Sequence, residues 1–212
     1  MDDQTLKTGT TTVGIVCKDG LVMGADKRAT AGYLVAHKKT EKICKITDTI
    51  AVTMAGSASD GQLLVKLAQA ELRLKKLRTN KETSVKEAAN LIARMVYSNI
   101  RKFSLIPGIS HFLCGGVDDT GFYLYDLFAD GSIELVDDFI SSGSGSVMAY
   151  GVLETLYKKG ISVNEGVDLA LKCVNAALQR DIATGNGIQI ITITKDGIKI
   201  VLEKELNMRI EA

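Results

Sequence analysis

Apolar, β-branched runs separated by short polar turns occur at both ends of the chain. The runs 11–17 and 21–23 flank Lys18-Asp19-Gly20, and the runs 188–194 and 198–202 flank Lys195-Asp196-Gly197. Asp-Gly between apolar runs favours a hairpin, because glycine tolerates the positive φ of the turn. We therefore expect a hairpin near each end of the chain. Four further β-rich runs predict strands over residues 50–54, 112–117, 122–127 and 133–136.

Helical periodicity separates these groups of strands. Spacings of three and four place one apolar set on a single face of a helix of about four turns; its members are Leu63, Leu67, Ala70, Leu74 and Leu77. Ser84 and Glu87 form a capping-box pattern, and so do Ser162 and Glu165, which predicts a helix start at each. The buried face after the first box is Val85, Ala88, Ile92, Met95 and Val96, and the one after the second is Val167, Ala170, Leu171, Val174 and Leu178.

The predicted order is strands, two helices, strands, two helices, strands, with the second helix running to about residue 103 and the third over 147–158. Helix pairs that alternate with antiparallel strands need sheet faces to pack on, and two stacked sheets between helix layers would bury every apolar stripe. We expect an α+β fold, a four-layer α-β-β-α sandwich. The basic residues interleaved with the leucine stripe are interpreted as a solvated helix face; they are Arg73, Lys75, Lys76 and Arg78.

Length and composition fit one domain in a reducing compartment. The chain has 212 residues, is 46% hydrophobic and carries a net charge of +1, so its overall charge does not indicate nucleic acid as a partner. Its apolar runs are shorter than a membrane span of about 20 residues. The four cysteines form no C-x-x-C pair, which favours buried thiols over a zinc site; they are Cys17, Cys44, Cys114 and Cys173. We expect a soluble, cytoplasmic protein without cofactor, metal, membrane or nucleic-acid partner.

Most familiar catalytic motifs are missing: the sequence contains no G-x-S-x-G, no H-E-x-x-H and no phosphate-binding loop. The two histidines, His37 and His111, stand in no recognisable setting, and we assign neither a role.

A threonine-rich segment follows the short polar leader and opens the first strand. By itself, a run such as Thr10-Thr11-Thr12 most often reflects β-propensity. Its position after Gly9 changes that interpretation, because a threonine hydroxyl becomes a useful nucleophile when a free α-amine, with a pKa of about 7.7 to 8.0, can accept its proton. Cleavage between Gly9 and Thr10 would create that amine. Gly9 would let the backbone bend so that the hydroxyl reaches the preceding carbonyl.

Seven motifs spread over nearly the whole chain resemble an archaeal proteasome β subunit, a threonine protease of the N-terminal nucleophile hydrolases. They are specific only in combination. They are Gly9-Thr10-Thr11-Thr12-Val13-Gly14, Ala25-Asp26-Lys27-Arg28, Lys42, Met54-Ala55-Gly56, Ser142-Gly143-Ser144-Gly145-Ser146, Tyr150-Gly151-Val152-Leu153 and Gln179-Arg180-Asp181.

The resemblance implies a leader at residues 1–9, removed by self-cleavage, and a single catalytic domain at 10–212. It implies Thr10 as nucleophile, Lys42 as the cation that tunes its proton transfer, and Asp26 as the carboxylate that holds Lys42. Without the Thr10 motif, Asp26 and Lys42 would be interpreted as unrelated surface charges. The resemblance further implies that Ser144, Asp181 and Thr184 position the α-amine and its water. It implies that the backbone amide of Gly56 binds the oxyanion.

By the same matching, Ala29, Met54 and Ala58 line the pocket for the residue before the cut. Two alanines beside a methionine leave a roomy apolar site, so cleavage of unfolded proteins after large hydrophobic residues is expected. The implied partners are other β subunits and α subunits in stacked heptameric rings, with an ATPase regulator acting through the α ring.

Two alternatives remain at this stage. A noncatalytic ring subunit of the same fold, such as a proteasome α subunit, would carry an extra N-terminal helix for which nine residues are too few. A different N-terminal nucleophile hydrolase, such as a small-amide hydrolase or the bacterial two-ring protease, would differ in substrate size or in its need for α subunits.

Overall fold

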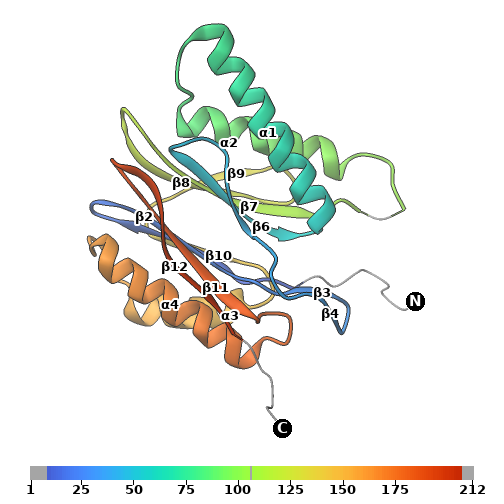
Figure 1. The fold of residues 1–212 in the computed structure, drawn as a ribbon, viewed down its shortest axis with the longest axis vertical. Helices are drawn as coiled ribbons and strands as arrows, with labels where there is room; N and C mark the ends of the chain where they lie inside the picture. The colour runs from blue at the N-terminus through green and yellow to red at the C-terminus, as the bar shows by residue number, and fades with distance from the viewer. Residues whose placement is uncertain (1–8, 106, 207–212) are drawn as a thin grey trace.

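Two antiparallel sheets stacked face to face form the centre of the molecule (Figure 1). The structure is a computed structural model and describes residues 9–105 and 107–206, so the expected leader lies outside it except for Gly9. The first sheet contains, in spatial order, β10 (Phe139–Ser142), β1 (Thr12–Cys17), β2 (Gly20–Asp26), β11 (Gly187–Thr194) and β12 (Gly197–Glu205). The second contains β5 (Ile43–Lys45), β6 (Ile50–Gly56), β7 (Ser110–Asp118), β8 (Gly121–Leu127) and β9 (Ile133–Val136).

A pair of helices covers the outer face of each sheet. Figure 1 shows α1 (Ala58–Thr79) and α2 (Val85–Ile100) on the second sheet, and α3 (Ser146–Leu156) and α4 (Val163–Arg180) on the first. This arrangement confirms the predicted four-layer sandwich. Each layer boundary has its own apolar core: one beneath α1 and α2, one beneath α3 and α4, and one between the sheets that includes Leu21, Met23, Leu113 and Leu124.

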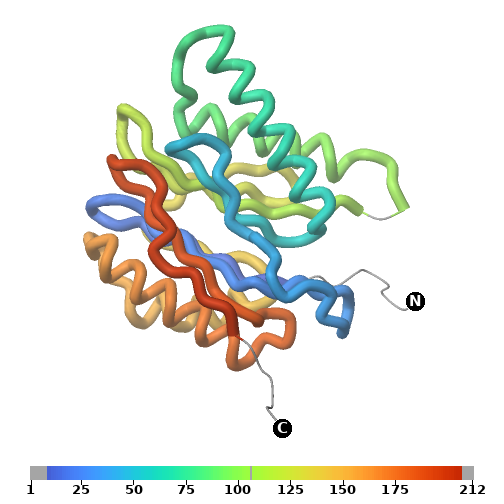
Figure 2. The backbone as a smooth tube through the Cα atoms, viewed as in Figure 1, coloured from blue at the N-terminus to red at the C-terminus, as the bar shows by residue number. Residues whose placement is uncertain are grey.

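Both predicted hairpins are confirmed. Strands β1 and β2 pair across Lys18-Asp19, and β11 and β12 pair with Thr194 opposite Gly197. The two hairpins are neighbours in space although they are far apart in sequence, because β2 also pairs with β11, and Figure 2 shows the two ends of the described chain running side by side. The N-terminal segment is therefore held in the middle of a sheet rather than at its edge.

Both predicted capping boxes are also confirmed. Ser84 accepts a hydrogen bond from the backbone N–H of Glu87, whose side chain accepts one from the backbone N–H of Ser84, and Ser162 and Glu165 repeat this geometry at the start of α4. Each box satisfies backbone donors that have no partner within the helix. Helix α2 ends at Ile100, three residues before the predicted end.

The predicted buried face of α1 is wrong. Leu63, Leu67, Leu74 and Leu77 are 49%, 45%, 43% and 74% exposed, and Ala70 is exposed as well. The buried face is instead Gly61, Leu64, Val65, Ala68 and Leu72. Both sets recur at spacings of three and four, so periodicity alone did not separate them. The sheet accepts the face with small residues: Gly61 packs against Met54 of β6, where an added Cβ would come within 3.2 Å of the Met54 sulfur.

Several smaller expectations are corrected. Leu171 is 40% exposed, and Leu169 and Cys173 lie in the core in its place. Four short strands were not predicted. They are β5, β10, and β3 (Ala29–Ala31) with β4 (Leu34–His37), which form a separate two-stranded sheet. Three or four residues are too few to show a reliable alternation.

The four thiols are free. Cys17, Cys114 and Cys173 are buried as expected, whereas Cys44 is only half-buried. Burial raises the pKa of Cys17, Cys114 and Cys173 to about 12. Within the described residues, none of the helices has the length and apolar character needed to cross a membrane.

Candidate active site

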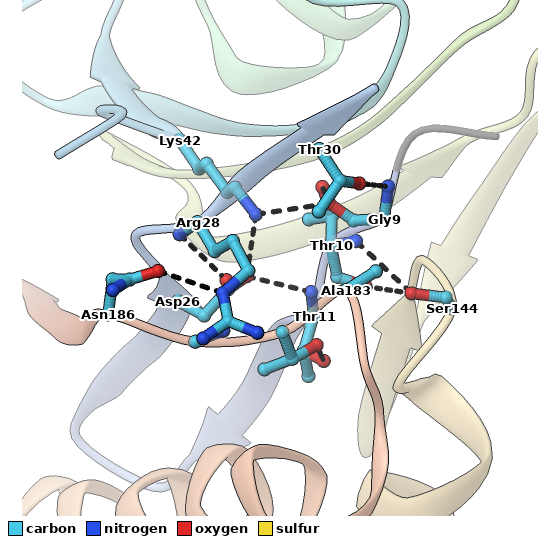
Figure 3. Close-up of polar contacts among 12 residues, drawn as sticks. Gly9, Thr10, Thr11, Asp26, Arg28, Thr30, Lys42, Ser144, Ala183 and Asn186 are labelled. Carbon is cyan, nitrogen blue, oxygen red and sulfur yellow. Dashed lines mark hydrogen bonds and ion pairs between the residues drawn. The ribbon is translucent and has the colours of Figure 1, made fainter. Parts of the chain in front are cut away.

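Thr10 lies two residues before the start of β1 and is 5% exposed. Its Oγ1 donates a hydrogen bond of 2.7 Å to the carbonyl oxygen of Gly9, and its backbone N–H donates one of 3.2 Å to Ser144 Oγ. The hydroxyl therefore rests against the carbonyl of the peptide bond that joins Gly9 to Thr10 (Figure 3).

Asp26 and Lys42 form a buried ion pair beside Thr10. The two side chains are almost completely buried, and Lys42 Nζ lies 2.7 Å from Asp26 Oδ1 and 3.4 Å from the Gly9 carbonyl oxygen. Burial lowers the pKa of Lys42 from its ordinary value of 10.5, and the charges of Asp26 and Asp181 oppose that shift. The structure thus places Lys42 beside the carbonyl of Gly9 and Asp26 beside Lys42.

Asp26 is held rigidly because both of its oxygens have two donors. Oδ1 accepts from Lys42 Nζ and from Thr11 N at 3.0 Å, and Oδ2 accepts from Arg28 N and Gly185 N, each at 3.0 Å. Asp26 is the last residue of β2, where it faces the start of β1. Four donors from separate parts of the chain therefore fix the orientation of this carboxylate.

A second chain of hydrogen bonds approaches Thr10 from the other side. Ser144 Oγ donates to Asp181 Oδ2 at 2.6 Å, and Thr184 Oγ1 donates to the same oxygen at 2.5 Å. Thr184 Oγ1 also lies 2.6 Å from Thr11 Oγ1. Since Thr11 N donates to Asp26, the six predicted residues Thr10, Asp26, Lys42, Ser144, Asp181 and Thr184 belong to one connected network.

The loop between β10 and α3 wraps closely around Thr10. Gly145 N donates to the Thr10 carbonyl at 3.3 Å. Gly143 has φ +91°, and a Cβ there would overlap the Thr10 carbonyl oxygen. Gly9 is also confined, because a Cβ added to it would overlap the side chain of Ala183. Close packing around Thr10 therefore leaves no room for a side chain at Gly9 or at Gly143.

The predicted oxyanion donor and pocket residues lie outside this network. Gly56 ends β6 with φ +99°, a conformation that favours glycine, and a Cβ there would overlap the carbonyl oxygen of Ile109. Met54 is half-buried; its N–H donates to the Lys42 carbonyl at 2.8 Å while its side chain packs on Gly61 of α1. Ala29 is half-buried on β3 and Ala58 is exposed at the start of α1.

Three residues of the network were missed as participants by the sequence analysis. Thr11 links Asp26 to Thr184, and Thr30 Oγ1 accepts a 3.0 Å hydrogen bond from the N–H of Gly9. Arg28 donates from Nη1 to the Ile182 carbonyl and from Nε to the side chain of Asn186, both at 2.8 Å, and so ties down the loop that carries Asp181 and Thr184. Thr11 could have been predicted from its position next to the suspected nucleophile. No local sequence pattern indicates Thr30.

The arrangement can support acyl transfer. A hydroxyl, a buried cation and a carbonyl carbon meet at one point, and the cation can stabilise the negative charge that develops on the carbonyl oxygen. Among the residues that the structure describes, no group of three or more His, Cys, Asp or Glu side chains could hold a metal ion.

Comparisons with known proteins identify strong similarity over the whole chain. The family described as "Proteasome subunit" matches residues 6–193. The proteasome subunit beta of Methanothermobacter thermautotrophicus is 43% identical over 212 residues, which is 100% of this chain and 99% of that protein. The proteasome subunit beta of Methanobrevibacter ruminantium is 44% identical, covering 100% and 98% of the two chains, and that of Ferroglobus placidus is 44% identical, covering 92% and 95%.

Proposed function

The chain belongs to the proteasome subunit family as a proteolytic β subunit of the archaeal type, and from this premise we propose that it is a threonine endopeptidase whose nucleophile, Thr10, is released by self-cleavage after Gly9. The observation that carries the proposal is the contact between Thr10 Oγ1 and the Gly9 carbonyl oxygen at 2.7 Å, with Lys42 Nζ 3.4 Å from the same oxygen.

Self-cleavage follows from these contacts in two steps. Thr10 Oγ1 attacks the Gly9 carbonyl carbon, and the carbonyl oxygen takes negative charge next to the Lys42 cation. The bond from that carbon to Thr10 N then breaks as the proton given up by Oγ1 passes to the nitrogen. The product is an ester between Gly9 and the Thr10 hydroxyl. One water molecule then hydrolyses the ester, which leaves a carboxylate on Gly9 and restores the hydroxyl beside a new α-amine.

Peptide hydrolysis uses the same groups after the leader has left. The new α-amine of Thr10, with a pKa of about 7.7 to 8.0 in an unperturbed chain, accepts the proton of Oγ1 as the hydroxyl attacks a substrate carbonyl. Ser144 and Asp181 orient the amine, as the hydrogen bonds from Thr10 N to Ser144 and from Ser144 to Asp181 support. Thr184 keeps the hydroxyl expected at its position and directs it to Asp181. Gly56 supplies its backbone N–H to the oxyanion.

The proposal for substrate preference rests on Ala29, Met54 and Ala58. Small side chains at two of these positions leave room for a large hydrophobic residue before the cut. Fluorogenic peptides that differ only at that residue test this directly. Peptides with leucine or phenylalanine there should be cleaved at least about tenfold faster than the glutamate peptide, since desolvating a carboxylate in an apolar site is unfavourable by more than about 1.4 kcal/mol. Equal rates would contradict the preference.

A subunit of this family assembles with other proteasome subunits. We extend the proposal to stacked heptameric rings of β subunits between rings of α subunits, an ATPase regulator, unfolded proteins as substrates and a cytoplasmic location. The exposed leucine face of α1 supports burial against a neighbour, because a continuous apolar stripe on a monomer is rarely left in water. Native mass spectrometry of the chain with α subunits measures the stoichiometry, and a stable monomer in that mixture would contradict it.

The main experiment compares the parent, Thr10→Ala and Thr12→Val after assembly with α subunits, by intact mass and peptidase assay. The parent should lose residues 1–9 and cleave peptides, and Thr10→Ala should do neither. Thr12→Val is the matched control, because the Thr12 hydroxyl is buried and has no hydrogen-bond partner among the described residues, so an isosteric methyl group should leave both activities unchanged. Peptidase activity in Thr10→Ala would overturn the proposal and favour another nucleophile; a parent that neither processes nor cleaves would favour a noncatalytic ring subunit.

A further inference from the structure

His111 bridges the two sheets at the edge of the core between them. One ring nitrogen, Nδ1, lies 2.8 Å from Ser142 Oγ on the first sheet, and the other, Nε2, contacts Asp126 Oδ1 on the second. The ring stacks on Phe128 with 5.1 Å between ring centroids. His111 belongs to β7, Asp126 to β8 and Ser142 to β10, so three strands that are separate in sequence meet at one side chain.

The chemistry of the three groups defines the orientation of each. Asp126 is 2% exposed, and an ionised carboxylate at such a site needs a donor. The ionised carboxylate only accepts hydrogen bonds, so Nε2 carries a proton toward Asp126. The other ring nitrogen, Nδ1, shares a hydrogen bond with the Ser142 hydroxyl. Ser142 is 4% exposed and its strand pairs with β1, so its hydroxyl lies inside the fold between His111 and the N-terminal strand.

One end of this bridge is continuous with the loop that holds Thr10. Ser142 is the last residue of β10, directly before Gly143, which packs on the Thr10 carbonyl. Two residues further, Ser144 accepts the hydrogen bond from Thr10 N, and Gly145 donates to the Thr10 carbonyl. The position of Ser142 is therefore linked through two residues of backbone to the groups that contact Thr10.

The other end is continuous with the proposed oxyanion donor. In the pairing of β6 with β7, His111 stands opposite Ala55, and Ser110 stands opposite Gly56. The carbonyl of Ile109 accepts a 2.7 Å hydrogen bond from Ser57 N and excludes any Cβ at Gly56. The segment that places Gly56 thus continues directly into His111.

We infer that His111 is a positioning residue for the proposed reaction of Thr10: held by Asp126, it fixes Ser142 and thereby sets the Ser144 loop relative to Gly56. The inference rests on the proposed function, because it concerns the distance between Ser144, which orients the α-amine of Thr10, and the backbone amide of Gly56, which binds the oxyanion. Ser144 follows β10 of the first sheet and Gly56 ends β6 of the second. His111 joins these two sheets next to both residues. Loss of the hydrogen bond to Ser142 should lower kcat rather than raise KM, since neither His111 nor Ser142 belongs to the proposed substrate pocket of Ala29, Met54 and Ala58.

The test measures kcat, KM and thermal stability on the assembled, processed enzyme, with four substitutions. Ser142→Ala removes the hydroxyl, His111→Gln keeps an amide near the Nε2 position, and His111→Asn keeps one near the Nδ1 position. The matched control is Ser141→Ala: Ser141 is the adjacent serine, is 5% exposed and donates to the Thr12 carbonyl at 2.7 Å without touching His111.

Ser142→Ala and His111→Gln should each lose about 10- to 100-fold in kcat, the effect expected of misplaced groups, with KM changed by less than about threefold. His111→Asn should recover part of that loss because it still reaches Ser142, and it should lower thermal stability because Asp126 loses its donor. Combining Ser142→Ala with His111→Gln should cost no more than either alone, since both remove one interaction. Ser141→Ala should lower thermal stability while kcat stays at the parent value.

Three results would overturn the inference: parental kcat in Ser142→Ala, equal loss in the two His111 variants, or the same fall of kcat in Ser141→Ala. Thr10→Ala, run alongside, separates this inference from the proposed function. An inactive Thr10→Ala with a fully active Ser142→Ala rejects the role of His111 alone, whereas an active Thr10→Ala rejects the nucleophile itself.

Discussion

Replacing Asp26 by asparagine keeps the shape of the side chain and removes its charge. An amide group has donors on one side, so it cannot accept from Lys42 Nζ, Thr11 N, Arg28 N and Gly185 N as the carboxylate does. The buried Lys42 ammonium also loses its counter-ion. Removing one partner of a buried pair typically destabilises a protein by about 3–5 kcal/mol, which corresponds to a fall in Tm of about 6–20 °C for a chain of this size.

Urea and thermal unfolding of the full chain measure that loss, and a double variant identifies its cause. If the loss comes from the unpaired ammonium, Asp26→Asn combined with Lys42→Met should regain most of the stability, because no charge remains buried. Removal of residues 1–9, followed by intact mass, should remain slow in the double variant, since the cation next to the Gly9 carbonyl is missing. Regained stability without processing separates the structural role of the pair from its chemical role.

The pH dependence of Asp26→Asn provides a second signature. Burial lowers the pKa of Lys42, and Asp26 opposes that shift, so the substitution should lower the Lys42 pKa further. Between the lowered value and the ordinary 10.5 of Lys42, the unfolded chain binds more protons than the folded chain, so the free energy of unfolding rises with pH. That rise should therefore begin at lower pH in Asp26→Asn than in the parent. Parental stability in Asp26→Asn, within about 0.5 kcal/mol, together with an unchanged pH profile, would refute the reasoning.

Two further predictions concern the packing around Thr10. Thr30→Val removes the acceptor of the Gly9 N–H and should slow removal of the leader about tenfold, the effect of about 1.4 kcal/mol; a time course of intact mass checks this, and a parental rate would contradict it. Gly143→Ala should destabilise the chain by at least about 1–3 kcal/mol in urea unfolding, because of its positive φ and the overlap with the Thr10 carbonyl. Gly151→Ala is its control, because a Cβ added to this helical glycine meets no other atom. The free energy of unfolding should rise by about 0.5–1 kcal/mol in this variant. A loss equal to that of Gly143→Ala would contradict the packing argument.

The sequence alone determined the features that depend on neighbouring residues. The Asp-Gly turns and the two capping boxes are correct to within a few residues, because turn conformation and helix starts are decided by local backbone geometry and local hydrogen bonds. The role of Thr10 remains a proposal, which the sequence suggests through the position of this residue after Gly9 and close to the start of β1. Asp26 and Lys42 could be named only through a family resemblance, since no local pattern links two residues in different strands and loops.

Tertiary structure decided which surfaces and which distant residues meet. Two faces of α1 carry the same helical period, and packing on the sheet buries the face with Gly61, which lies close to Met54. Thr30 reaches Gly9, and His111 reaches Ser142, because strands far apart in sequence are brought together by sheet packing. Such contacts depend on the three-dimensional arrangement of whole layers, to which short-range patterns along the chain are insensitive.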